Sequence, residues 1–120
     1  MVHEMVIAQQ ILEVALEEAR RHRGRCITAL HLRLGDLEGV ESEVMREAFA
    51  IVAQGTIAEE AELAIERIPS RLACEECGEE AMVEELVHGG AIMERCRKCS
   101  GPYRILQGKG WTLETVRVST

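Results

Sequence analysis

Four cysteines in two matching pairs are the residues of this sequence best suited to chemistry. Cys74 and Cys77 are separated by two residues, and so are Cys96 and Cys99. Such a spacer lets one tight turn direct two sulfurs at a common point, and two turns supply the four sulfurs of a tetrahedral zinc site. Four thiolates leave no open position on the metal, so the spacing predicts a structural zinc. A pair of redox dithiols is the alternative interpretation.

Glycines follow each cysteine pair. Gly78 comes directly after Cys77, and Gly101 comes two residues after Cys99. We expect both glycines to supply the backbone conformation that such turns require. The fifth cysteine, Cys26, stands apart in the sequence and is expected to be a small buried residue rather than a ligand.

Histidines offer a second kind of metal site. His3 lies close to the terminal α-amine, and an amine, amide nitrogens and an imidazole can close fused chelate rings in one plane. Square-planar nitrogen sites suit Ni(II) and Cu(II). A terminal histidine without any ligand role is the ordinary alternative. His88, beside Gly89 and Gly90, is expected to be either an exposed loop residue or a further ligand that reaches the N-terminal metal.

Composition limits the class of function. The 120 residues carry a net charge of −7, and only three of them are aromatic: Phe49, Tyr103 and Trp111. Because nucleic-acid binding depends on a basic face, we expect no nucleic-acid partner. The single dense basic run, residues 20–25, is interpreted as a solvated helix end. No apolar stretch suits a membrane span and no signal peptide is visible, so we expect a cytoplasmic protein with reduced cysteines and no membrane partner.

Hydrophobic periodicity predicts the elements that must position these residues. Helices are expected at 5–23 and 43–54, and strands at 27–34, 61–68 and 113–118. Residues 71–105 show no amphipathic period and are too few to fold on an apolar core alone. The predicted fold class is α+β, with two helices packed on a three-stranded sheet and an inserted zinc-ribbon-like subdomain. Residues 1–70 plus 106–120 would form a nickel-binding α/β domain, and residues 71–105 a tetracysteine zinc-binding subdomain.

Local signals refine these boundaries. Ser42 is a good N-cap for the second helix, and Gly24 and Gly55 are expected to end the two helices. Leu113 is out of phase with Val116 in the last strand, which predicts a bulge or a shifted start.

Several short motifs occur together in a family-like order. They are His3-Glu4-Met5, Leu32-Arg33-Leu34-Gly35, Gln54-Gly55-Thr56, Ala61-Glu62-Leu63 and the two cysteine pairs. This ordered set resembles the hydrogenase nickel-incorporation protein HypA family (HypA/HybF) over nearly the whole chain. The resemblance implies a nickel metallochaperone, not an enzyme, that delivers Ni(II) to the [NiFe]-hydrogenase large subunit. It also implies the GTPase HypB as a partner and, for some members, service to urease.

The resemblance also implies ligands. Zinc would be held by the four paired cysteines, and nickel by His3 and Glu4 together with the N-terminal amine. The family's histidine directly follows the initiator methionine, whereas Val2 intervenes here. The amine is that of Val2 if Met1 is removed and that of Met1 if it stays, and Val2 can also be a cloning scar. A zinc-ribbon interaction or nucleic-acid-binding module without nickel transfer is the alternative function.

Overall fold

The computed structural model describes residues 2–82, 87–88, 91–92 and 95–120. It divides into two compact units. Unit 1 comprises Met1–Arg33, Gly39–Glu66 and Trp111–Thr120, and unit 2 comprises Leu34–Glu38 and Arg67–Gly110. Unit 2 is therefore wider than the zinc subdomain expected at residues 71–105. Among the described residues, no helix has the length and apolar character needed to cross a membrane.

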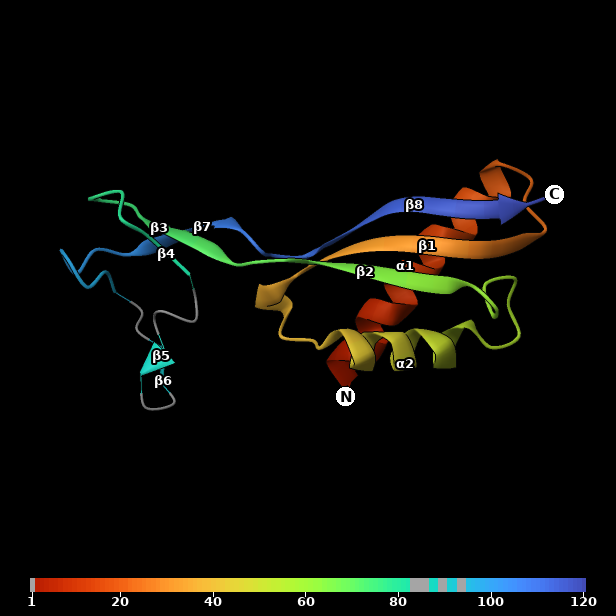
Figure 1. Ribbon diagram of the computed structural model, residues 1–120, viewed down its shortest axis with the longest axis horizontal. Helices are drawn as coiled ribbons and strands as arrows, with labels where there is room; N and C mark the ends of the chain where they lie inside the picture. The colour runs from red at the N-terminus through yellow and green to blue at the C-terminus, as the bar shows by residue number, and fades with distance from the viewer. Residues whose placement is uncertain (1, 83–86, 89–90, 93–94) are drawn as a thin grey trace. The chain divides into compact units, whose positions relative to one another are not determined.

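Unit 1 holds two helices and most of a three-stranded sheet (Figure 1). The helices are α1 (Val2–Arg21) and α2 (Ser42–Ala53). The strands are β1 (Cys26–Gly35), β2 (Glu62–Ile68) and β8 (Trp111–Ser119), in the order β2-β1-β8. A short 3-10 helix, η1 (Asp36–Glu38), follows β1. The predicted α+β class, with two helices and a three-stranded sheet, is confirmed.

The core of unit 1 is aliphatic. Most of its large buried side chains come from one stripe of each helix and from β1: Ile7, Ile11, Leu12, Ile27, Leu30, Leu32, Met45 and Phe49. Burying one such side chain stabilises the fold by about 1.5–3 kcal/mol, before the entropic cost of ordering the chain is counted. This set is large enough for unit 1 to depend mainly on the hydrophobic effect.

Both ends of α1 differ from the prediction. The helix starts at Val2 rather than at residue 5, so His3 and Glu4 lie in its first turn. At the other end, Gly24 was expected to end the helix, but α1 ends at Arg21 and the left-handed residue is Arg23, with φ +55°. Gly24 is required for space instead, because a Cβ there would lie 2.7 Å from the Cβ of Val118.

The start of α2 was also predicted one residue late. Glu41 occupies the N-cap position and makes no side-chain capping hydrogen bond, whereas Ser42 is already the first helical residue. The expected Ser42 cap is therefore wrong. The C-terminal prediction is confirmed, since Gly55 follows the helix with φ +78°.

In two strands, the alternation of buried and exposed side chains shifts along the strand. In β1 the buried side chains shift from Ile27 to Leu30, and Thr28 between them is exposed. In β8 two successive residues, Glu114 and Thr115, are exposed. The irregularity expected between Leu113 and Val116 falls at these two residues.

Unit 2 is built on short strands. The strands β3 (Arg71–Cys74), β4 (Glu80–Ala81) and β7 (Tyr103–Gln107) form an antiparallel sheet in the order β4-β3-β7. A separate hairpin pairs β5 (Val87–His88) with β6 (Ala91–Ile92). This arrangement agrees with the predicted zinc-ribbon-like insert.

Three segments of unit 2 approach one another closely. The amide of Gly35 donates to the carbonyl of Gly110 at 2.8 Å, and the amide of Leu37 donates to the carbonyl of Gly108 at 2.9 Å. Arg67 forms an ion pair with Asp36 at 2.8 Å. The approach leaves no room for a side chain at Gly35, where a Cβ would lie 2.1 Å from the carbonyl oxygen of Gly108.

Replacing Gly35 should therefore destabilise unit 2. In Gly35→Ala, the new methyl group meets backbone rather than a movable side chain, so we expect a loss of about 1–3 kcal/mol in the free energy of unfolding. Chemical denaturation followed by circular dichroism measures this loss. Gly39→Ala is the control, because no atom lies within 4 Å of its Cβ and its cost is confined to the backbone strain at φ +69°. Equal losses in the two variants would contradict the steric argument.

Candidate metal centre

The four paired cysteines lie in two turns of unit 2. Cys74 ends β3, and Cys77 lies in the turn between β3 and β4. Cys96 and Cys99 lie in a second turn, which the pairing of Arg95 with Pro102 closes just before β7. The antiparallel sheet brings the two turns together, because Cys74 lies opposite Tyr103 in the pairing of β3 with β7.

The two turns share one hydrogen-bond pattern. The amide of Cys74 donates to the carbonyl of Glu79, and the amide of Gly78 donates back to the carbonyl of Cys74, at 2.9 and 3.0 Å. In the second turn, the amide of Cys96 donates to Gly101 and the amide of Ser100 donates back to Cys96, both at 2.9 Å. The repeated pattern orients each pair of sulfurs in the same way.

The sulfur atoms converge on one point. The Sγ atoms of all four cysteines lie within 4.8 Å of one another. Cys74 and Cys99 are 3.4 Å apart, and Cys77 and Cys96 are 3.7 Å apart. Sulfurs bound tetrahedrally to zinc at about 2.3 Å lie about 3.8 Å from one another, so the cluster fits a zinc ion. Among the described residues, no other group of histidine, cysteine and acidic side chains is gathered closely enough to hold a metal.

Backbone amides point at the sulfurs. The amides of Glu76 and Cys77 donate to the Sγ of Cys74 at 3.4 and 3.5 Å, and the amide of Lys98 donates to the Sγ of Cys96 at 3.3 Å. Donation from Cys77, opposed by burial and aided by Glu76, lowers the pKa of the Cys74 thiol to about 7. These donors favour the thiolate, which is the form that binds metal.

The thiol of Cys99 holds its proton more tightly than the thiol of Cys74 does. The Gly101 amide favours the Cys99 thiolate, yet the adjacent Cys74 raises the pKa of Cys99 to about 12. Like charges this close cannot all ionise unaided at neutral pH. A divalent cation at the centre would remove this repulsion, and this chemistry is a second reason why the donor set suits zinc.

One expectation about the turns is wrong. Gly78 has φ +78°, as predicted, but in the second turn the left-handed residue is Ser100, with φ +63°. Gly101 provides space instead, because a Cβ there would lie 2.9 Å from the Sγ of Cys74. Sequence reasoning assigned the wrong role to Gly101 because a close approach of another strand leaves no local signal.

The remaining candidate residues lie apart from this cluster. Cys26 begins β1 in unit 1 and is half-buried, with its sulfur 3.7 Å from the carbonyl of Ile27. His3 is exposed and Glu4 half-buried, next to each other in the first turn of α1. His88 belongs to β5 rather than to a loop, and its side chain, like Met1 with its amine, lies outside the described residues.

Comparison with known proteins identifies the family. Residues 2–118 match the family model described as hydrogenase/urease nickel incorporation, metallochaperone, HypA. The chain belongs to the HypA family. A hydrogenase maturation factor HypA from Synechococcus sp. is 33% identical over 118 residues, covering 98% of this chain and 99% of that protein. Another from Chlorobaculum tepidum is 38% identical over 104 residues, covering 87% of this chain and 86% of that protein.

Solved HypA structures share the fold. The solution structure of the nickel metallochaperone HypA from Helicobacter pylori superposes with a TM-score of 0.65 at 18% identity, over 96% of each chain. A second HypA solution structure gives a TM-score of 0.67 at 18% identity, over 99% of this chain and 98% of the other. At this identity the likeness supports the fold alone, and the family assignment depends on the sequence matches.

The rate of zinc release can distinguish the role of Gly101 from that of Ser100. In Gly101→Ala, the added methyl group displaces the Cys74 sulfur, so we expect zinc to pass to a competing chelator about tenfold faster or more. Ser100→Gly relieves a left-handed residue and should stabilise the fold by about 1 kcal/mol without faster zinc release. Metal analysis and a chromogenic chelator measure both effects, starting from wild-type protein with one zinc per chain. Equal release rates in the two variants would show that Gly101 has no steric role.

Proposed function

We propose that this chain is a nickel metallochaperone that binds Ni(II) at its N-terminus and delivers it during [NiFe]-hydrogenase maturation, with urease as a further recipient. The observation that carries this proposal is the family match from residue 2 to residue 118, which spans both predicted metal-binding regions. The protein acts as a carrier and not as an enzyme. Nickel is its cargo, and zinc is its structural ion.

The nickel ligands are His3, Glu4 and the N-terminal amine of Met1 or Val2. The start of α1 at Val2 supports this choice, because the first amides of a helix have no acceptor within the helix. The partial positive charge of a helix N-terminus opposes a cation there. The carboxylate of Glu4, together with amides that lose their protons on binding nickel, offsets that charge.

The zinc ligands are Cys74, Cys77, Cys96 and Cys99. Their converging sulfurs and the amides directed at them support this assignment. Bound zinc supplies a cross-link between the two turns, and its binding free energy contributes directly to the folding of unit 2. The four cysteines saturate a tetrahedral ion, so this site does not exchange cargo.

The proposed partners are those of the maturation machinery that the family and the sequence support. Nickel would pass to the large subunit of [NiFe]-hydrogenase with the help of the GTPase HypB, in the cytoplasm. The chain carries no glycine-rich phosphate-binding motif, so we propose that nucleotide chemistry belongs to the partner. Its charge of −7 supports a function without a nucleic-acid partner.

Removal of the His3 imidazole tests the nickel site. We expect His3→Ala to weaken Ni(II) binding at least about 10–100-fold. Replacing a residue that only orients a metal ligand already weakens metal binding by this much, and His3 is proposed as a ligand itself. Zinc content should stay unchanged, because the thiolates are separate atoms. Calorimetric titration of zinc-loaded protein with its own untagged N-terminus makes the measurement. His22→Ala is the control, since His22 is also exposed on unit 1 but pairs with Glu18. Unchanged nickel affinity in His3→Ala would refute the N-terminal site.

His88 is proposed as an additional nickel ligand on the sequence argument alone. If it binds the metal, His88→Ala should weaken nickel binding without loss of zinc, and Ni(II) should shift the imidazole resonances of His88 in the wild type. Calorimetry and NMR on the same samples provide both readouts. Identical affinity together with unshifted His88 resonances would confine the nickel ligands to the first few residues.

A further inference from the structure

A group of exposed arginines lies where α1 ends and β1 begins. This basic cluster is formed by Arg20, Arg21, Arg23, Arg25 and Arg117. The amide of Arg25 donates to the carbonyl of Ser119 at 2.8 Å, and the hydroxyl of Thr28 donates to the carbonyl of Arg117 at 3.4 Å. These bonds place the end of β8 beside the start of β1. The cluster stands out in a chain whose net charge is −7.

Only part of the cluster is neutralised by its neighbours. Arg20 hydrogen-bonds to Glu17 and Arg21 to Glu18, each three residues earlier on the helix. Arg23, Arg25 and Arg117 have no ion pair with any residue that the structure describes. Three exposed guanidinium groups therefore remain available to a ligand.

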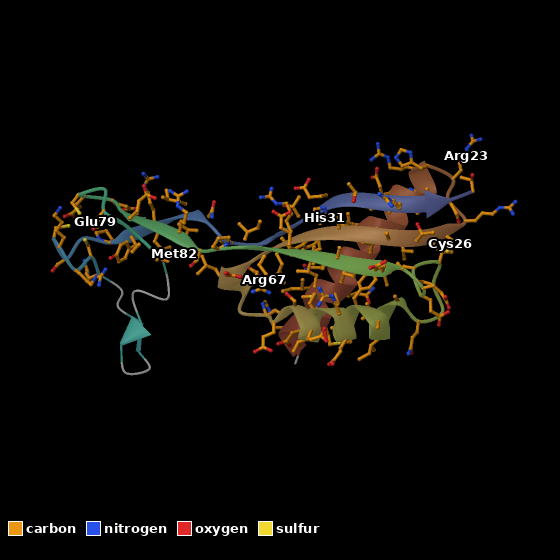
Figure 2. The ribbon with its side chains drawn as sticks, in the orientation of Figure 1. Arg23, Cys26, His31, Arg67, Glu79 and Met82 are labelled. Atoms are coloured by element: carbon orange, nitrogen blue, oxygen red, sulfur yellow. The ribbon has the colours of Figure 1, made fainter. Side chains whose placement is uncertain are left out.

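Arg23 occupies a backbone position where glycine would be less strained. Arg23 lies just beyond the end of α1 (Figure 2). Its φ is +55°, a conformation that costs a non-glycine residue about 1–2 kcal/mol. The turn is held by the amide of Gly24, which donates to the carbonyl of Ala19 at 2.8 Å. Glycine at position 23 would relieve the strain, and the arginine side chain makes no ion pair or side-chain hydrogen bond with the described residues in return. Strain kept for an exposed, unengaged side chain is typical of a binding surface.

We propose that the basic cluster docks a short acidic segment of a partner protein. Guanidinium groups bind carboxylates through two parallel hydrogen bonds, and three of them match a segment carrying two or three carboxylates. A nucleic acid fits less well, because such binders make about 6–10 phosphate contacts along an extended basic face. Glu17 and Glu18 border the cluster on the helix and would repel a longer polyanion.

A labelled peptide tests the proposal. The probe is fluorescein-labelled hexaglutamate, with hexaglutamine as the neutral peptide, and binding is followed by fluorescence anisotropy at low salt. The test variant combines Arg23→Gly with Arg25→Ala. The control combines Arg104→Ala with Lys109→Ala, which removes the same charge from exposed positions in unit 2. Replacing Arg23 by glycine should also raise the melting temperature, so weaker binding could not be attributed to a damaged fold.

The expected result is that hexaglutamate binds the wild type and the control alike, and the test variant about five- to tenfold more weakly. Hexaglutamine should not bind. Amide NMR shifts on peptide addition should fall on residues 20–25 and 117. An equal loss of binding in both double variants, or no binding of hexaglutamate to the wild type, would overturn the proposal. Tighter binding of an oligothymidylate through the same arginines would overturn the choice of partner.

Discussion

The convergence of four sulfurs on one point is the constraint on which unit 2 depends. Among its described residues other than glycine, the buried ones are Leu34 and a set of small side chains, namely Ser70, Ala73, Cys74, Ala81 and Cys96. Of the larger aliphatic residues that the structure describes in this unit, Ile105 and Leu106 are exposed. Short strands with so little apolar surface to bury require another source of free energy, and a metal cross-link supplies it. Unit 1, by contrast, has an aliphatic core of its own. The two units therefore respond to different conditions: the first to whatever weakens the hydrophobic effect, the second to acid and chelators.

The sequence predicted best where chemistry itself fixes the spacing. The two-residue spacers of the cysteine pairs determined the sulfur cluster, because few other structures need that pattern. The apolar periods located both helices and the three strands of unit 1, because burial of one face is the main source of their stability. The irregularity of β8 was also visible in advance, since Leu113 and Val116 are out of phase in the sequence itself.

Predictions that depended on contacts between distant segments failed. Gly24 was expected to end α1 and Gly101 to supply the backbone conformation of its turn, but in both places the preceding residue has the positive φ. Each glycine is needed because a segment distant in sequence passes within about 3 Å of where a Cβ would lie. That approach comes from Val118 in one case and from Cys74 in the other. The early start of α1 was missed for a related reason, because a helix that packs on a core can extend beyond its own periodic stripe.

The four cysteines of the cluster differ in their exposure to solvent. Each turn contributes one buried cysteine, Cys74 or Cys96, and one exposed cysteine, Cys77 or Cys99. With zinc bound, a competing ligand from solution would reach Cys77 and Cys99 more readily than Cys74 and Cys96. The two buried cysteines would hold the ion until a turn opens. The lifetime of a bound ion would then depend on how often these turns open, and not on the strength of the four bonds alone.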